Sequence, residues 1–452
     1  MSKRRAAFLT LGCKVNQYET DAMEEILEKN GYDIVSFKET ADVYIINTCS
    51  VTNMADRKSR QMIHRAKKNN PDAVIVAAGC YVQAAEKEMA EKNMADILVG
   101  NNKKKDIAQI LEEYFAVKAV KEEQQVPLVS EVIDINHTKE YEDLTIHKVN
   151  EHTRAYIKIQ DGCNQFCSYC IIPYTRGRIR SKNPEEVIEE VKNLAAQGYK
   201  EIVLTGIHLS SYGKDLGDIT LLDVIQRIQQ IEDIERIRLG SLEPRIITEQ
   251  FVKELRACDK VCPHFHLSLQ SGCDETLKRM NRKYTTEEYE TALNVLRTYY
   301  EHPALTTDVI AGFVGETEEE FEKTRAYLEK INLYEMHIFK YSVREGTRAQ
   351  KMSGHVPEQV KTERSDILLA MAKRHKSEFE KWYVGRKEKV LLEEIIEKNG
   401  KKYFQGYTAH YVKVAVELTE NDTKLEQNEV IVVDIQGFID ENLLYGKVSI
   451  EF

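Results

Sequence analysis

Short apolar runs alternate with amphipathic segments through the first 116 residues, as they do where strands are followed by helices. Regular alternation of this kind predicts a parallel sheet with crossover helices, so we expect an N-terminal open-sheet domain over 1–116. The periodicity fades over 117–150, where charges and Pro127 predict a linker. The predicted strands cover 8–11, 43–46, 73–78 and 97–99, and the predicted helices cover 19–28, 54–68, 84–92 and 105–115.

The same alternation returns on a larger scale over 151–384, and a charged helix through Lys381 closes this part. Such βα units predict an open, partial (β/α)6 barrel, so both parts belong to the α/β class. Barrels of this kind gather their chemistry on the loops that follow the C-terminal ends of their strands. The predicted strands cover 155–159, 202–205, 234–239, 265–269, 306–311 and 336–341.

The last part, 385–452, changes character. Short β-branched and aromatic runs are separated by turn signals such as NG and END, which predicts a small all-β barrel. In size it resembles barrels that bind oligonucleotides. It carries 9 Lys and Arg against 13 Asp and Glu. This negative balance keeps open a docking or lid domain that does not contact RNA.

Composition excludes several classes of protein. A chain of 452 residues is too long for one core, which agrees with three parts. Nine cysteines are too sparse for a disulfide scaffold and odd in number, so we expect reduced thiols, metals or catalysis. Charged residues interrupt every apolar run, and the start MSKRRAAFLTLGCKVNQ lacks a signal-peptide cleavage site. We expect a cytoplasmic protein without a membrane partner.

The net charge of −10 argues against a uniformly basic surface for nucleic acid, so we expect no DNA partner, and any RNA partner needs a local basic patch. The run IIPYTRGRIRS offers one, with Arg176, Arg178, Arg180 and Tyr174. Arginine forks suit phosphate, and aromatic planes suit extruded bases of a single-stranded loop. The alternative is that these arginines pair with acidic helices such as EEVIEE.

The strongest chemical signal is DGCNQFCSYC, which places Cys163, Cys167 and Cys170 in a C-x3-C-x2-C loop directly after the first barrel strand. A structural zinc site takes four ligands, and no fourth Cys or His lies nearby. A cubane iron–sulfur cluster also normally takes four thiolates, so this triad would leave one iron open to a substrate. The alternative is an incomplete zinc knuckle or three unrelated thiols.

A second set of cysteines, Cys13, Cys49 and Cys80, is scattered in the N-terminal part, but each follows a predicted apolar strand in LTLGC, IINTC and VAAGC. The C-terminal ends of parallel strands lie along one edge, so three thiols there can converge. Buried, inert thiols are the alternative.

The Cys163 loop resembles the signature of the radical S-adenosylmethionine superfamily, with Tyr169 as the aromatic residue before the last cysteine. The resemblance implies that the open iron chelates the amino and carboxylate groups of S-adenosylmethionine, which is split to methionine and a 5′-deoxyadenosyl radical. Later strand ends should hold the rest of the cofactor, with ordinary strand-end packing as the alternative. Tyr169 aside, the candidates are Gly206, Gln270, Thr307, Asp308, Phe339 and Tyr341.

Across nearly its whole length, the chain resembles the radical S-adenosylmethionine methylthiotransferases, which join an N-terminal three-cysteine domain to a radical domain and a small barrel of the TRAM type. This resemblance implies that Cys13, Cys49 and Cys80 hold an auxiliary [4Fe-4S] cluster and Cys163, Cys167 and Cys170 a second one. It also implies an electron donor of flavodoxin or ferredoxin type.

The words GCKVNQYET and DGCNQFCSYCIIPYTRGR look most like the branch acting on N6-threonylcarbamoyladenosine. That branch would transfer a methylthio group to carbon 2 of this base at position 37, in the anticodon loop of tRNA. Isopentenyladenosine is the alternative substrate, and a non-catalytic, metal-containing RNA-binding protein is the alternative of another class.

Three cysteines, Cys258, Cys262 and Cys273, receive no role from the resemblance. The run C-x3-C-P-H-F-H, with His264 and His266, would allow zinc binding, but His266 lies in an apolar strand pattern that is more typical of the core.

Overall fold

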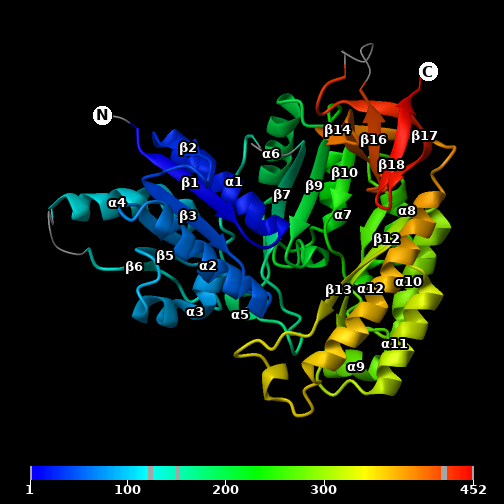
Figure 1. Cartoon of the computed structure of the whole chain (residues 1–452), viewed down its shortest axis with the longest axis horizontal. Coiled ribbons are helices and arrows are strands. Elements are labelled where there is room, and N and C mark those ends of the chain that lie inside the picture. The colour runs from blue at the N-terminus through cyan, green and yellow to red at the C-terminus, as the bar shows by residue number, and fades with distance from the viewer. Residues whose placement is uncertain (1–2, 121–125, 149–152, 419–424, 450–452) are drawn as a thin grey trace.

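The computed structural model describes residues 3–120, 126–148, 153–418 and 425–449. Figure 1 shows a blue-to-cyan N-terminal part beside a green-to-orange central part, with a small red barrel at one end of the latter. Within the described ranges, every helix is too short or too polar to cross a lipid bilayer.

The N-terminal part is one parallel sheet in the order β2-β1-β3-β4-β5-β6. Alternate strand residues point to opposite faces, so β3 sends Tyr44 and Ile46 into one apolar cluster and Val43 and Ile45 into another. Both faces are therefore buried under helices. The strands are β1 (Arg5–Thr10), β2 (Asp33–Val35), β3 (Val43–Thr48), β4 (Val74–Gly79), β5 (Ile97–Val99) and β6 (Val129–Glu131), and the helices are α1 (Lys14–Lys29), α2 (Asn53–Asn69), α3 (Cys80–Glu91), η1 (Lys104–Asp106) and α4 (Ile107–Val120).

The expected linker over 117–150 is more structured than the sequence indicated, although 121–125 and 149–150 lie outside the described residues. Helix α4 runs to Val120, and β6 adds a sixth strand beside β5. The strands β2 and β6 lie at the two edges of the sheet and contain exposed polar residues, so they lack the buried apolar run that made the equally short β5 recognisable from sequence.

The central part is a partial barrel whose parallel strands β7, β9, β10, β11, β12 and β13 follow one another in chain order, as the sequence predicted. Single parallel bridges, Ile237 to Val261 and Leu242 to Leu267, connect β10 with the β11 segment. The short strand β8 runs antiparallel to β7. The strands are β7 (Arg154–Asp161), β8 (Arg180–Ser181), β9 (Glu201–Gly206), β10 (Arg236–Leu239), β11 (His264–His266), β12 (Ala304–Ala311) and β13 (Glu335–Lys340).

Amphipathic helices cover the outside of this barrel, and Val224, Ile225 and Ile228 of α7 illustrate the buried stripe. The helices are α5 (Ile172–Thr175), α6 (Pro184–Ala196), η2 (Leu209–Ser211), α7 (Leu221–Ile228), η3 (Pro244–Ile246), α8 (Glu249–Arg256), α9 (Asp274–Arg279), α10 (Thr286–Tyr299), α11 (Glu318–Ile331), η4 (Ala349–Lys351) and α12 (Glu358–Lys381).

The C-terminal part is a closed barrel in the order β14-β15-β16-β18-β17. It docks on the end of the central barrel where β7 and β9 begin: Arg236 donates to the carbonyl oxygens of Tyr407 and Lys389, and Arg238 to that of Ala409. It thus lies opposite the strand ends that carry the cysteine loop (Figure 1). The strands are β14 (Lys387–Lys398), β15 (Lys401–Thr408), β16 (Lys413–Glu417), β17 (Val430–Asp440) and β18 (Leu443–Val448).

Candidate functional site

The loop of Cys163, Cys167 and Cys170 lies between β7 and α5 and is fixed by backbone hydrogen bonds. The Cys163 N–H donates to the Gly177 carbonyl (3.0 Å), and the Cys170 N–H donates to that of Cys167 (3.0 Å). Gly162, just before the loop, has φ +71°, and a Cβ there would lie 1.8 Å from the Arg178 carbonyl oxygen. Only glycine fits this close approach, so the loop is pre-shaped by its backbone.

The three cysteines line a cavity of about 320 Å³ at the C-terminal ends of the central strands. Five of the seven predicted cofactor residues line it too, and they lie in the cysteine loop, after β11, on β12, and on or just after β13. A mostly apolar cleft with a few polar groups is the usual form of a small-molecule site. The five residues are Tyr169, Gln270, Asp308, Phe339 and Tyr341.

The other two predicted cofactor residues, Gly206 and Thr307, do not line this cavity. Thr307 is fully buried, and its hydroxyl donates to the Leu267 carbonyl (2.5 Å) and accepts from the Leu269 N–H (2.9 Å), which braces the β11 segment against β12. A Cβ on Gly206 would lie 2.9 Å from Cβ of Gln160, so its missing side chain makes room for Gln160.

Several residues that line the cavity were missed from sequence. His208, Ser241 and Ser268 each lie one or two residues past a strand, so the strand-end rule applied more widely would have found them. Arg282 lies between the helices α9 and α10, so a rule about strand ends would not have found it. Its Nη1 donates to Sγ of Cys167 across 3.3 Å.

Burial in this cavity keeps the thiols of Cys163 and Cys170 and the imidazole of His208 uncharged at neutral pH. Burial raises the pKa of Cys163 to about 11 and that of Cys170 to about 12, and Arg282 opposes both shifts. Burial and then Arg282 lower the pKa of His208 to about 4, so its imidazole is neutral. A bound cation that takes thiolates must therefore displace protons from these thiols.

The second set of cysteines meets at one edge of the N-terminal sheet, where β1, β3 and β4 end. Cys13 caps α1, Cys49 follows β3, and Cys80 is the first residue of α3. Gly12 has φ +112°, and a Cβ there would lie 3.0 Å from Sγ of Cys49, so glycine leaves room for that thiol. Burial and the charges of Cys80 and Cys13 raise the pKa of Cys49 to about 12, which indicates that the thiols interact.

Neither thiol triad has the close spacing of a site for a single metal ion. Among the described residues, neither triad brings its three sulfur atoms within 4.8 Å of one another. One tetrahedral zinc ion holds its sulfurs about 3.8 Å apart, given Zn–S bonds of about 2.3 Å. A cubane iron–sulfur cluster binds each thiolate at a different iron and so needs a wider set.

The segment after Cys49 joins the two sites. Val51 and Thr52 line the cavity of the Cys163 loop. Arg344, in the loop after β13, donates to the hydroxyl of Ser50 (2.7 Å) and to Oδ1 of Asn53 (2.7 Å). One wall of the cavity therefore comes from the N-terminal part of the chain.

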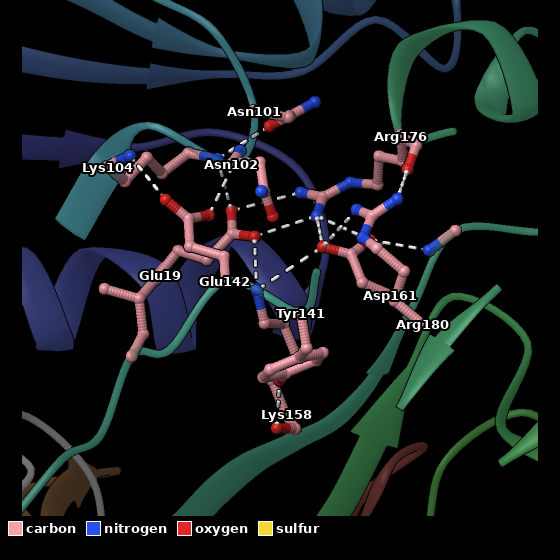
Figure 2. A network of polar contacts seen from close by, with 12 residues as sticks. Glu19, Asn101, Asn102, Lys104, Tyr141, Glu142, Lys158, Asp161, Arg176 and Arg180 are labelled. Carbon is pink, nitrogen blue, oxygen red and sulfur yellow. Dashed lines mark hydrogen bonds and ion pairs between the residues drawn. The ribbon is translucent and has the colours of Figure 1, made fainter. Parts of the chain in front are cut away.

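The three arginines do not form the surface patch that the sequence predicted. Arg176 and Arg180 are 0% and 1% exposed, and both lie within ion-pair distance of Asp161, as Figure 2 shows. The prediction is wrong for these two, because they pair with buried carboxylates: both with Asp161, and Arg176 also with Glu19 of the N-terminal part. Only Arg178 is exposed; its guanidinium lies 4.4 Å from the ring centre of Phe166.

Tyr174, 43% exposed, lies beside Phe166 with ring centres 6.0 Å apart. Phe166, Tyr174 and Arg178 thus form a small aromatic and cationic surface at the cysteine loop.

The remaining cysteines, Cys258, Cys262 and Cys273, are buried and join no metal-binding group among the described residues. His266 contacts Thr306 (3.0 Å) and Asp308 (3.3 Å) instead. Together with His337, these two residues, His266 and Asp308, form a possible metal-binding group. In the described part of the chain, it is the one group of at least three His, Cys, Asp or Glu residues whose ligand atoms all lie within 4.8 Å of one another. The alternative zinc site of the C-x3-C-P-H-F-H run does not form.

Comparison with known families finds two matches. Residues 5–100 match the "Uncharacterized protein family UPF0004", and residues 157–328 match the "Radical SAM superfamily". Among solved structures, the cobalamin-containing radical S-adenosylmethionine methyltransferase TsrM of Kitasatospora setae matches with a TM-score of 0.54 and 15% identity over 75% of each chain, a likeness of fold alone.

Curated relatives match nearly the full length. The threonylcarbamoyladenosine tRNA methylthiotransferase MtaB of Bacillus subtilis is 42% identical over 92% of this chain and 91% of its own, and that of Aquifex aeolicus is 41% identical over 87% and 93%. A tRNA-2-methylthio-N(6)-dimethylallyladenosine synthase of Clostridium botulinum is 36% identical over 88% of each chain.

Proposed function

Because the chain belongs to the radical S-adenosylmethionine tRNA methylthiotransferase family, we propose that it transfers a methylthio group to carbon 2 of N6-threonylcarbamoyladenosine at position 37 of tRNA. The observation that carries the proposal is that Val51 and Thr52, just past Cys49, line the same cavity as Cys163, Cys167 and Cys170. The segment that follows one triad thus forms part of the cavity wall of the other, and a reaction that joins a sulfur group to a radical-activated carbon requires such proximity.

We assign one [4Fe-4S] cluster to Cys163, Cys167 and Cys170 and another to Cys13, Cys49 and Cys80, because each set offers three free thiols at neighbouring points of the fold. When bound, the clusters and S-adenosylmethionine supply the electron, the 5′-deoxyadenosyl radical and the methylated sulfur. The hydrogen on carbon 2 would leave in 5′-deoxyadenosine, and the methylthio sulfur would give up its bond to the auxiliary site and bond to carbon 2. The auxiliary site would take up the one surplus electron.

The protein's own part is to bind, orient and exclude water. We assign Gln270, Asp308 and Tyr341, which line the cavity, to the polar parts of S-adenosylmethionine, and Tyr169 and Phe339 to the apolar walls around it. A primary carbon radical is quenched in water unless its target is already held against it. Gly206 and Thr307 act indirectly, because they set the packing of the strands beneath the cavity.

The anticodon loop would meet the surface formed by Phe166, Tyr174 and Arg178. The exposed ring of Tyr174 and the half-buried ring of Phe166 suit stacking on unpaired bases, and the exposed guanidinium of Arg178 suits phosphate. This surface replaces the larger arginine patch. The electron would come from a protein of flavodoxin or ferredoxin type.

The division of labour follows the three parts of the chain. We assign 1–116 to the auxiliary cluster, with β6 of the former linker completing its sheet, and 151–384 to radical generation. The barrel over 385–452 docks opposite the cavity through Arg236 and Arg238, so any contact it makes with RNA lies away from the reacting base.

Two substrates compete for the assignment. The relatives that act on threonylcarbamoyladenosine match this chain with higher identity than those that act on dimethylallyladenosine, also called isopentenyladenosine, which supports the first. Mass spectrometry of tRNA nucleosides from a strain lacking the gene decides between them. We expect 2-methylthio-N6-threonylcarbamoyladenosine to disappear and its unmethylthiolated form to accumulate; loss of the isopentenyl derivative instead would overturn the proposal.

A further inference from the structure

Arg176 belongs to the central part of the chain, but its side chain ends among residues of the N-terminal part. It follows α5, and its Nε donates to Sγ of Cys80 across 3.3 Å. Its Nη2 donates to Oδ1 of Asn16 (2.7 Å), and its Nη1 donates to Oε1 of Glu19 (2.8 Å) and to Asp161. Every nitrogen of the guanidinium is therefore committed, and its planar fork holds one orientation.

The surrounding network carries more positive than negative charge (Figure 2). All of its charged groups are buried, and ion pairs connect them, except that Glu142 is joined through a hydrogen bond from the backbone N–H of Lys104. Four cations thus face three carboxylates. The cations are Lys104, Lys158, Arg176 and Arg180, and the carboxylates are Glu19, Glu142 and Asp161.

An unbalanced buried positive charge is costly unless an anion lies nearby. The three thiols of Cys13, Cys49 and Cys80 are where that anion would be found, because Cys80 accepts directly from Arg176. A cluster held by thiolates is anionic, whereas neutral thiols would leave the charge uncompensated.

We propose that Arg176 is a positioning residue that sets the reduction potential of the auxiliary cluster, by donating a hydrogen bond to its Cys80 ligand and by holding the cation-rich network against it. The inference rests on the proposed role of Cys13, Cys49 and Cys80 as cluster ligands. Hydrogen bonds to a ligand sulfur and nearby positive charge stabilise the more negative, reduced form, so both raise the potential.

The test uses the full-length chain with Cys163, Cys167 and Cys170 changed to Ala, so that bound iron reports on the other triad. Its midpoint potential is measured by anaerobic redox titration followed by electron paramagnetic resonance. Arg176→Lys keeps the charge but loses the Nε donor, and we expect a lower midpoint at unchanged iron content. Arg364→Lys is the matched control, because Arg364 is also buried and ion-paired, to Glu316, and should leave the midpoint unchanged.

A second variant changes the charge of the network and should shift the midpoint potential in the opposite direction. Glu19→Gln removes a carboxylate from the network without changing Arg176 or Cys80, so we expect a higher midpoint. An effect on folding alone would not move the two variants in opposite directions. Unchanged midpoints in both variants, with iron fully bound, would overturn the inference. Failure of the parent chain to bind iron at all would instead count against the proposed ligand set.

Discussion

Arg344 and Asp56 form an ion pair of 2.7 Å between the loop that follows β13 and the first turn of α2, and both side chains are largely buried. Through Ser50 and Asn53 the same arginine holds the segment that follows Cys49. This contact is what keeps the N-terminal wall of the cavity in place.

Arg344→Ala should open that wall. Removing one partner of a buried pair costs about 3 kcal/mol of folding stability, because little solvent reaches the charge that is left unpaired. We expect lower thermal stability and a loss of methylthiolated product that exceeds the loss of S-adenosylmethionine cleavage. Product and 5′-deoxyadenosine are measured in the same assay, and an equal fall in both would show that the contact does not align the two sites.

Cys13→Ala should separate the two thiol triads by function. Cys13 lies at the end of β1 and contributes nothing to the lining of the Cys163 cavity, so reductive cleavage of S-adenosylmethionine should continue. The methylthiolated nucleoside should not form, because the auxiliary sulfur site is lost. Cys163→Ala is the matched control and should abolish both activities. Equal loss of both activities in Cys13→Ala would refute separate roles.

Gly162→Ala should disrupt the radical loop while sparing the N-terminal triad. A Cβ would lie 1.8 Å from a backbone oxygen, which no side-chain rotation relieves. If each triad holds a cluster, bound iron should fall by about half. Gly198→Ala is the control, because Gly198 also has a positive φ (+93°) but open space around it, and its iron content should stay near that of the parent chain.

Much of this architecture could be predicted because it depends on local patterns. Each cysteine of the N-terminal triad follows an apolar run, so its place at a sheet edge could be inferred without knowing the sheet order. The role of Arg176 could not, because nothing near it in sequence indicates that Glu19 is buried beside it. The prediction that Thr307 contacts the cofactor fell short for a similar reason: the adjacent strand residues Thr307 and Asp308 point to opposite faces, and sequence does not say which one faces the cavity.

The junction with the C-terminal barrel should be sensitive to acid. Burial alone would raise the pKa of Glu201, but Arg238, Arg236 and Arg154 outweigh it and lower the pKa to about 2. A carboxyl whose pKa is lowered on folding contributes stability that is present above its unfolded pKa and lost as pH falls through the folded value. We therefore expect the free energy of unfolding to fall between about pH 4 and pH 2. In Glu201→Gln that part of the acid dependence should disappear, as urea titrations at several pH values would measure.

Arg178→Gln should weaken tRNA binding but leave the cleavage of S-adenosylmethionine in the absence of tRNA unchanged. Arg178 is the exposed member of the three arginines and lies over Phe166 at the mouth of the cysteine loop, so its loss should remove one phosphate contact. We expect affinity for tRNA to fall about 3- to 10-fold and the slope of log affinity against log salt to become shallower by about one. Tightly bound iron and cleavage of S-adenosylmethionine without tRNA should match those of the parent chain.

Arg227→Gln is the control, because Arg227 is also exposed but pairs with Glu185 on the helical surface, and it should leave the salt slope unchanged. Equal slopes in all three proteins would place the RNA contact elsewhere.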